Sequence, residues 1–140
     1  MPDLPFKILG IEHVGIAVRD LNKISEIFGD ILGLELHRRE NVTDQKVITD
    51  IYHSGSGKLE FLKATSPESS IAKFLEKRKE GIHHIALKVD KLQPALDHLS
   101  ANGIQLIDSE PRISAEELKI AFIHPKSTNG VLVELCEGSK

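Results

Sequence analysis

The chain has 140 residues, about the length of one domain, and 40% of them are hydrophobic, enough for a packed core. The formal net charge is only -3 and no block of lysine and arginine stands out, which argues against a nucleic-acid partner. A single cysteine, Cys136, excludes a disulfide framework and a cysteine-rich zinc site. No apolar stretch approaches the roughly 20 residues that cross a bilayer, and no signal or transit segment is visible. We therefore expect a cytoplasmic protein with no membrane partner.

The first half of the chain is predicted to fold in the order βαβββ. Its opening strand, residues 13–18, precedes a helix-like stretch from Asn22 to Leu32, which Gly33 would end. Three strand candidates follow, at residues 34–36, 46–53 and 58–62.

A turn-rich segment then leads into a linking helix. Ser69 or Ser70 could cap this helix, which is predicted over Ile71 to Lys79. Gly81 would end it.

The second half repeats the first. The sequence His84-Ile85-Ala86-Leu87-Lys88-Val89 reads like His13-Val14-Gly15-Ile16-Ala17-Val18, 71 positions earlier. A helix-like stretch from 93 to 101, Gly103 and strand candidates at 104–106, 118–124 and 132–135 follow in the same order. We predict an α+β protein of one domain, residues 1–140, built from two tandem βαβββ modules. Module one spans about 8–63, the linking helix about 69–80 and module two about 82–137.

Strand periodicity indicates where the repeated histidines point. Side chains alternate between the two faces of a strand, so Val14, Ile16 and Val18 share a face that should pack against helices. His13 lies on the other face, followed by the small residues Gly15 and Ala17, and small residues leave room for a concave site. The second repeat alternates in the same way.

The closing strand of each half carries a glutamate on the face opposite its apolar neighbours. These are Glu60 and Glu134, and each half therefore presents one histidine and one glutamate. Taken singly, such residues are more often structural histidines and solvated acids. Their recurrence favours one shared divalent ion, and two nitrogen and two oxygen donors suit cobalt, manganese, nickel, iron or zinc. A four-ligand set of this kind leaves coordination positions open, which is typical of catalytic sites.

Longer stretches of the chain resemble a known family. Residues 66–77 read Ser-Pro-Glu-Ser-Ser-Ile-Ala-Lys-Phe-Leu-Glu-Lys, and residues 81–90 read Gly-Ile-His-His-Ile-Ala-Leu-Lys-Val-Asp. Together with residues 124–135 and 13–18, they resemble the vicinal oxygen chelate superfamily, which includes glyoxalases and bleomycin-resistance proteins. The methylmalonyl-CoA epimerases are the most similar group in it. The resemblance implies a glyoxalase-like fold with a metal-lined concave sheet, and it places the metal ligands at His13, Glu60, His84 and Glu134.

The resemblance also implies a reaction and its participants. Epimerases of this group interconvert (R)- and (S)-methylmalonyl-CoA by 1,1-proton transfer through a metal-stabilised enolate. Asp44 stands where the resemblance places a glutamate acid/base, next to Gln45, and no second acid/base residue is assigned. Gln45, Lys119 and Lys126 are candidate contacts for an acyl-CoA substrate, and a homodimer is expected.

Two other functions are compatible with the same resemblance. A lactoylglutathione lyase of the glyoxalase I type can use the same four ligands, although residues 66–90 favour the epimerase. A non-catalytic small-molecule-binding resistance protein is the less favoured alternative, because such proteins usually lack the ligands and use aromatic surfaces. This chain has no tryptophan and one tyrosine, Tyr52.

Overall fold

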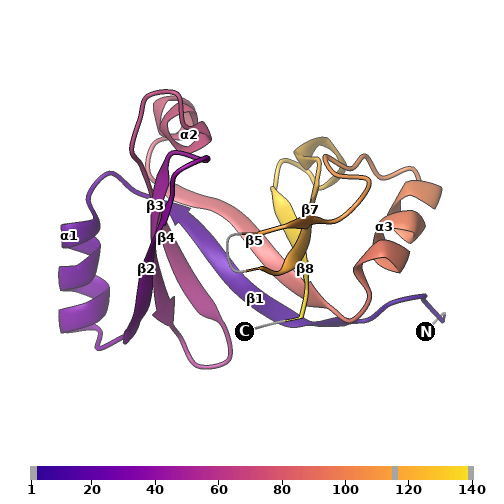
Figure 1. Cartoon of the computed structure of the whole chain (residues 1–140), viewed down its shortest axis with the longest axis horizontal. Helices are drawn as coiled ribbons and strands as arrows, with labels where there is room; N and C mark the ends of the chain where they lie inside the picture. Colours follow the sequence, from indigo (N-terminus) through magenta and orange to yellow (C-terminus); the bar gives the residue numbers. More distant parts are fainter. Residues whose placement is uncertain (1–2, 115–116, 139–140) are drawn as a thin grey trace. The chain divides into compact units, whose positions relative to one another are not determined.

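The computed structural model describes residues 3–114 and 117–138, and it contains the βαβββ order twice, as predicted (Figure 1). Among these residues, no helix has both the length and the apolar character needed to span a membrane. The elements are β1 (Ile8–Ala17), α1 (Leu21–Ile24) with its π-helical continuation η1 (Ser25–Ile31), β2 (Leu36–Val42), β3 (Val47–His53), β4 (Lys58–Ala64), α2 (Ser70–Arg78), β5 (Gly81–Val89), α3 (Leu92–Ala101), β6 (Arg112–Ile113), β7 (Lys119–Ile123), the short 3₁₀ helix η2 (Pro125–Ser127) and β8 (Val133–Glu137).

The chain forms two compact units that do not coincide with the two sequence repeats. The first unit is His13–His83, and the second joins Met1–Glu12 to His84–Lys140. Strand β1 therefore contributes its first half to the second unit and its second half to the first.

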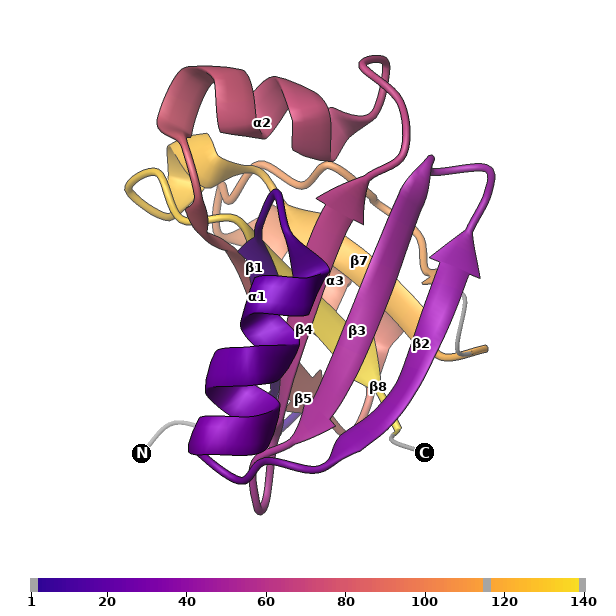
Figure 2. The same ribbon diagram turned by 90° about the vertical axis from the view of Figure 1, so that its left-hand side faces the viewer.

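In the first unit the strands follow the order β2-β3-β4-β1. The pairs β2–β3 and β3–β4 are antiparallel, whereas the β1 residues from His13 onward run parallel to β4. Helix α1 begins where the Asp20 carboxylate accepts hydrogen bonds from the backbone N–H groups of Asn22 and Lys23. It lies against one face of the sheet (Figure 2), where Phe61 and Tyr52 form the buried core beneath it. Burial of such aromatic side chains supplies much of the stabilisation of a small core.

Helix α2 covers a second apolar cluster of the first unit. Ile71 and Leu75, one helical turn apart, pack with Leu62 and Ala17, which lie on the opposite sheet face from Phe61. Of the two predicted candidates, Ser69 caps α2, because its Oγ accepts from the Ile71 N–H at 3.1 Å.

The second unit has the corresponding strand order β5-β8-β7-β6, with β5 parallel to β8. Its core lies between this sheet and α3, where Val89, Leu92, Leu96 and Leu135 are buried. The N-terminal segment joins this unit through Lys7, whose backbone donates to the Asp90 carboxylate at 2.6 Å and accepts from the Asp90 N–H at 3.2 Å.

Several element boundaries differ from the prediction, and β1 begins at Ile8 rather than at residue 13. The strand expected at 34–36 begins only at Leu36, and the strand expected at 104–106 is reduced to one bridge between Leu106 and Ile123. Helix α2 ends at Arg78, where Lys79 rather than glycine takes the left-handed conformation at φ +63°. Gly81 instead begins β5.

Candidate metal centre

In the first unit, strand pairing brings His13 and Glu60 together. The register of parallel β1 and β4 sets Gly15 opposite Glu60, so His13 is the diagonal neighbour of Glu60 on the same face. His13 Nδ1 and Glu60 Oε2 are 3.1 Å apart, and both residues are buried.

In the second unit, the same arrangement recurs with His84 and Glu134. Parallel β5 and β8 set Ala86 opposite Glu134, again two residues beyond the histidine. His84 Nε2 and Glu134 Oε1 are 3.5 Å apart, and both residues are buried. The structure thus confirms the repetition of the His–Glu pair and the predicted strand periodicity.

The donor atoms in each pair have the spacing of neighbouring ligands on one ion. Two atoms bound at 2.0–2.2 Å are roughly 2.8–3.1 Å apart at right angles and about 3.3–3.6 Å apart at tetrahedral angles. The observed 3.1 and 3.5 Å fall within these ranges. Buried imidazole and carboxylate groups also form the mixed nitrogen and oxygen set preferred by first-row divalent ions. The residues present therefore fit a divalent metal ion.

Cys136 and Lys58 are buried on the strands that carry these pairs, and neither was assigned a role from the sequence. Cys136, also on β8, donates from Sγ to Glu134 Oε2 at 2.9 Å, so it orients the oxygen that does not face His84. Lys58 opens β4 directly opposite His13 and is only 8% exposed. Each lies two residues from a predicted ligand, and this period-two spacing is the signal that could have revealed both.

Asp44 and Gln45 lie apart from the His13–Glu60 pair. Both are exposed in the turn between β2 and β3, where the Gln45 N–H donates to the Val42 carbonyl at 3.1 Å. The turn adjoins the far end of β4, four residues from Glu60, which is about 13 Å along an extended strand. The structure does not bring Asp44 into contact with the pair, and its role as acid/base stays a prediction.

The two predicted lysine contacts lie on the surface of the second unit. Lys119 is exposed and lies opposite Glu137 on β8. Glu137 is three residues from Glu134, so Lys119 and Glu134 lie on opposite faces of the sheet. Lys126 is exposed in η2.

Phe122 lies opposite Glu134 and on the same face of the sheet. The Arg112 guanidinium carbon lies 5.2 Å from the centre of the Phe122 ring.

His83 has the structural role expected from its position on the opposite face to His84. Its ring meets that of Phe74 on α2 edge-on, with centres 4.9 Å apart. Burial lowers the pKa of His83 below its ordinary value because the charged imidazolium loses hydration there. His83 is therefore a neutral packing group at physiological pH.

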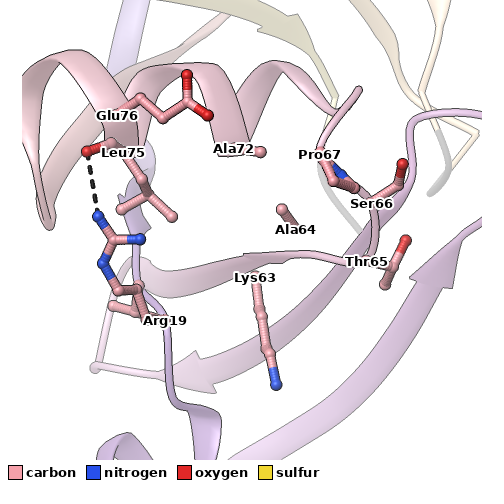
Figure 3. Close-up of a pocket in the computed structure, with 10 residues that line it drawn as sticks. Arg19, Lys63, Ala64, Thr65, Ser66, Pro67, Ala72, Leu75 and Glu76 are labelled. Atoms are coloured by element: carbon pink, nitrogen blue, oxygen red, sulfur yellow. Dashed lines mark hydrogen bonds between the residues drawn. The ribbon is translucent and has the colours of Figure 1, made fainter.

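A recess of about 410 Å³ lies in the first unit beside α2 (Figure 3), and neither His13 nor Glu60 lines it. Ala64, Ala72 and Leu75 leave an apolar space between the helix and the end of β4. Arg19 closes one end by donating from Nη2 to the Leu75 carbonyl at 3.2 Å. None of the residues predicted to form the site lines this recess.

Comparison with known proteins identifies the family to which the chain belongs. Residues 12–122 match the family model of the glyoxalase/bleomycin resistance protein/dioxygenase superfamily. An uncharacterised protein of Bacillus subtilis, YqjC, is 43% identical over 127 residues, covering 91% of each chain. The mitochondrial methylmalonyl-CoA epimerase of Dictyostelium discoideum is 36% identical over 128 residues, covering 91% of this chain and 77% of that protein. A crystal structure of methylmalonyl-CoA epimerase from Mycobacterium tuberculosis superposes with a TM-score of 0.87 at 34% identity, covering 95% and 90% of the two chains.

The chain belongs to the glyoxalase/bleomycin resistance protein/dioxygenase superfamily and, within it, to the group that includes methylmalonyl-CoA epimerases. The fold class and the family resemblance inferred from the sequence are thereby confirmed.

Proposed function

We propose that this protein is a metal-dependent epimerase that interconverts (R)- and (S)-methylmalonyl-CoA by 1,1-proton transfer. The carrying observation is the recurrence of a buried His–Glu pair at equivalent positions of β1/β4 and β5/β8, each pair with the donor spacing of neighbouring metal ligands. Similarity to methylmalonyl-CoA epimerases supports the reaction and an acyl-CoA substrate. A homodimer in the cytoplasm is part of the same proposal.

His13, Glu60, His84 and Glu134 would together hold one divalent ion, of cobalt, manganese, nickel, iron or zinc. When bound, this ion supplies positive charge near the oxygens on which negative charge develops as the α-proton leaves. The two glutamates balance its double charge. The Cys136 thiol keeps the second oxygen of Glu134 from turning away, because that oxygen accepts its hydrogen bond at 2.9 Å.

Asp44 is proposed as one of the two acid/base groups, and Gln45, Lys119 and Lys126 as contacts of the acyl-CoA. Asp44→Asn keeps the size of the side chain and removes the proton acceptor. We expect α-proton exchange to fall about 10²- to 10⁴-fold, the usual contribution of a general base. The turn that holds Asp44 lies apart from Glu60, so this variant is a strict test. If Asp44→Asn exchanges the α-proton at the wild-type rate, another residue transfers the proton.

The reaction is tested by incubating the metal-loaded protein with methylmalonyl-CoA in deuterated water and following the α-proton by NMR. Exchange accompanied by conversion of one epimer into the other supports the proposal. Turnover of the methylglyoxal–glutathione adduct without exchange would identify a lactoylglutathione lyase instead. Neither reaction, together with tight binding of an antibiotic, would identify a resistance protein.

The ligand set is tested by His84→Ala, with His37→Ala as the matched control. His37 is exposed, and its ring contacts only that of His53 among the ring contacts of the described residues. His84→Ala should lower metal content and abolish exchange, whereas His37→Ala should change neither. Full metal content and activity in His84→Ala would refute the proposed centre.

A further inference from the structure

Phe122 brings an aromatic side chain to the sheet face of the second unit that carries His84 and Glu134. It stands directly opposite Glu134 across β7 and β8, and directly opposed residues share a face. Its ring meets that of His84 edge-on, with the ring centres 6.1 Å apart. Its neighbours in sequence, Ala121 and Ile123, are buried in the core on the α3 side, whereas Phe122 is partly exposed. Part of the Phe122 surface is therefore available to a ligand beside the two predicted metal ligands.

Contacts on two sides restrict the movement of Phe122. Its backbone N–H donates to Asp108 Oδ2 at 2.9 Å, and its carbonyl accepts from the Ile107 N–H at 2.9 Å. The other oxygen of Asp108 lies 3.4 Å from Arg112 Nε, and the Arg112 guanidinium lies over the Phe122 ring. One carboxylate thus contacts both the backbone of Phe122 and the cation that covers its ring. We expect the ring to form a rigid boundary rather than a movable one.

A 1,1-proton transfer determines what such a boundary would meet. The proton leaves one side of the α-carbon and returns on the other, while the carboxylate and the thioester keep their positions. The remaining substituent of the α-carbon therefore occupies one place in both epimers. This place lies beside the metal ligands, because the α-carbon joins the two groups whose oxygens face them. Glu134 has Ala86 opposite it on β5 and Phe122 opposite it on β7, so a small residue leaves room on one side and a large apolar residue limits it on the other.

We propose that Phe122 contacts the α-substituent of the acyl group and sets the largest substituent accepted, so that a methyl group is favoured over a longer alkyl chain. This inference rests on the proposed function and deepens it by naming the residue that determines which malonyl-type thioesters are bound. One methylene group in a hydrophobic pocket changes discrimination about 10- to 200-fold. A rigid aromatic boundary therefore suffices to separate substrates that differ only in chain length.

The test uses three ligands that differ only at the α-carbon: malonyl-CoA, methylmalonyl-CoA and propylmalonyl-CoA. Phe122→Leu shortens the boundary and keeps an apolar side chain, and Phe122→Ala removes the boundary. Phe6→Leu is the matched control. Phe6 belongs to the same unit but packs against the core on the α3 side, with its ring 5.7 Å from that of His98.

Dissociation constants of the three ligands are measured by calorimetry on metal-loaded protein, and metal affinity is measured separately by competition with a chelator. The wild type should bind propylmalonyl-CoA at least about 10-fold more weakly than methylmalonyl-CoA. Phe122→Ala should bring propylmalonyl-CoA to at least the affinity of methylmalonyl-CoA, and Phe122→Leu should fall between. Binding of malonyl-CoA and of the metal should change less than about 3-fold in each variant. Phe6→Leu should keep the wild-type ratio between propylmalonyl-CoA and methylmalonyl-CoA.

The assignment is overturned if both Phe122 variants keep the wild-type ratio, or if they lose affinity equally for all three ligands. A loss of metal affinity as large as the loss of ligand affinity would overturn it too, since Phe122 would then only support His84 and Glu134. Circular dichroism verifies the fold, and Phe122→Leu alone decides the comparison if Phe122→Ala does not fold. The epimerase proposal is tested independently by α-proton exchange in the wild type. A size preference that depends on Phe122 without any exchange would refute the epimerase and leave Phe122 as the residue that limits the substituent.

Discussion

Replacing Arg39 should destabilise the protein more than replacing Asp50, although the two residues form one ion pair. The two residues oppose one another on β2 and β3, and Arg39 donates from Nε and Nη2 to the two carboxylate oxygens at 2.6 and 3.0 Å. Asp50 is 1% exposed, whereas about half of the Arg39 side chain is exposed. The hydrogen bond and charge of Asp50 raise the pKa of Arg39, so the pair favours the charged guanidinium.

Arg39→Met leaves a buried carboxylate without its cation, and breaking a buried pair in this way costs about 3–5 kcal/mol. The lower end, about 3 kcal/mol, applies here because water reaches the guanidinium side of the pair. Asp50→Asn lets Arg39 return to water and keeps one acceptor oxygen, so it should cost about 1 kcal/mol. The double variant should be more stable than Arg39→Met alone, because no buried charge remains.

Urea unfolding followed by circular dichroism measures these differences, provided the slope of free energy against urea is the same in all variants. A loss of 3 kcal/mol should also lower the melting temperature by about 10 °C in a chain of this size. Equal costs for the two single variants, or strict additivity in the double variant, would refute the assignment of the cost to the buried carboxylate.

Three further variants test other parts of the structure. Cys136→Ala should weaken metal binding about 10-fold in a chelator competition, and Cys136→Ser should retain more affinity because it still donates to Glu134; equal losses would exclude the hydrogen bond as the cause. Because the folded pKa of His83 lies below its ordinary 6.5, the unfolded chain binds the proton more readily, and stability should fall as pH drops below about 6.5. His83→Phe should remove the contribution of His83 to this loss, which is at most about 1.4 kcal/mol per pH unit. Urea unfolding at about pH 7.5 and about pH 5.5, on either side of the ordinary histidine pKa, measures it. If the unfolding free energy of His83→Phe depends on pH as strongly as that of the wild type, the prediction is wrong. Leu96→Ala removes a fully buried side chain from the inner face of α3 and should lower the unfolding free energy by about 2–5 kcal/mol. A loss below about 1 kcal/mol would mean that the core closes around the gap.

The sequence predicts the His–Glu pairs because strand periodicity and repetition are local signals. The small residues after each histidine and the apolar neighbours of each glutamate indicate which strand face these side chains occupy. In both units the parallel register then sets the glutamate opposite the residue two positions after the histidine. The helices were also predicted within one or two residues, since the capping Ser69 of α2 and the glycines Gly33 and Gly103 that follow η1 and α3 are local signals as well.

Features that depend on distant partners could not be predicted in this way. The segment at 104–106 has strand-forming residues, but only Leu106 finds a partner, Ile123. The face of Lys119 depends on its register with β8, and the burial of Lys58 depends on strands on both sides. Asp44 and Gln45 are adjacent in sequence, and both lie in the turn between β2 and β3, before β3 begins at Val47.

The division of β1 between the units has a consequence for fragments of this chain. A fragment cut between the two sequence repeats, after Glu80, separates the β1 residues 8–12 from the unit to which they belong. The C-terminal piece would lose both hydrogen bonds between Lys7 and Asp90, and the N-terminal piece would carry a strand end separated from its unit. Neither piece should fold well alone, but mixing them should restore the native spectrum by complementation. A circular permutant that opens the chain at the α2–β5 connection and joins the original termini would leave β1 uncut. Both units would then stay whole. The continuity of β1 should therefore matter more for folding than the order in which the repeats are joined.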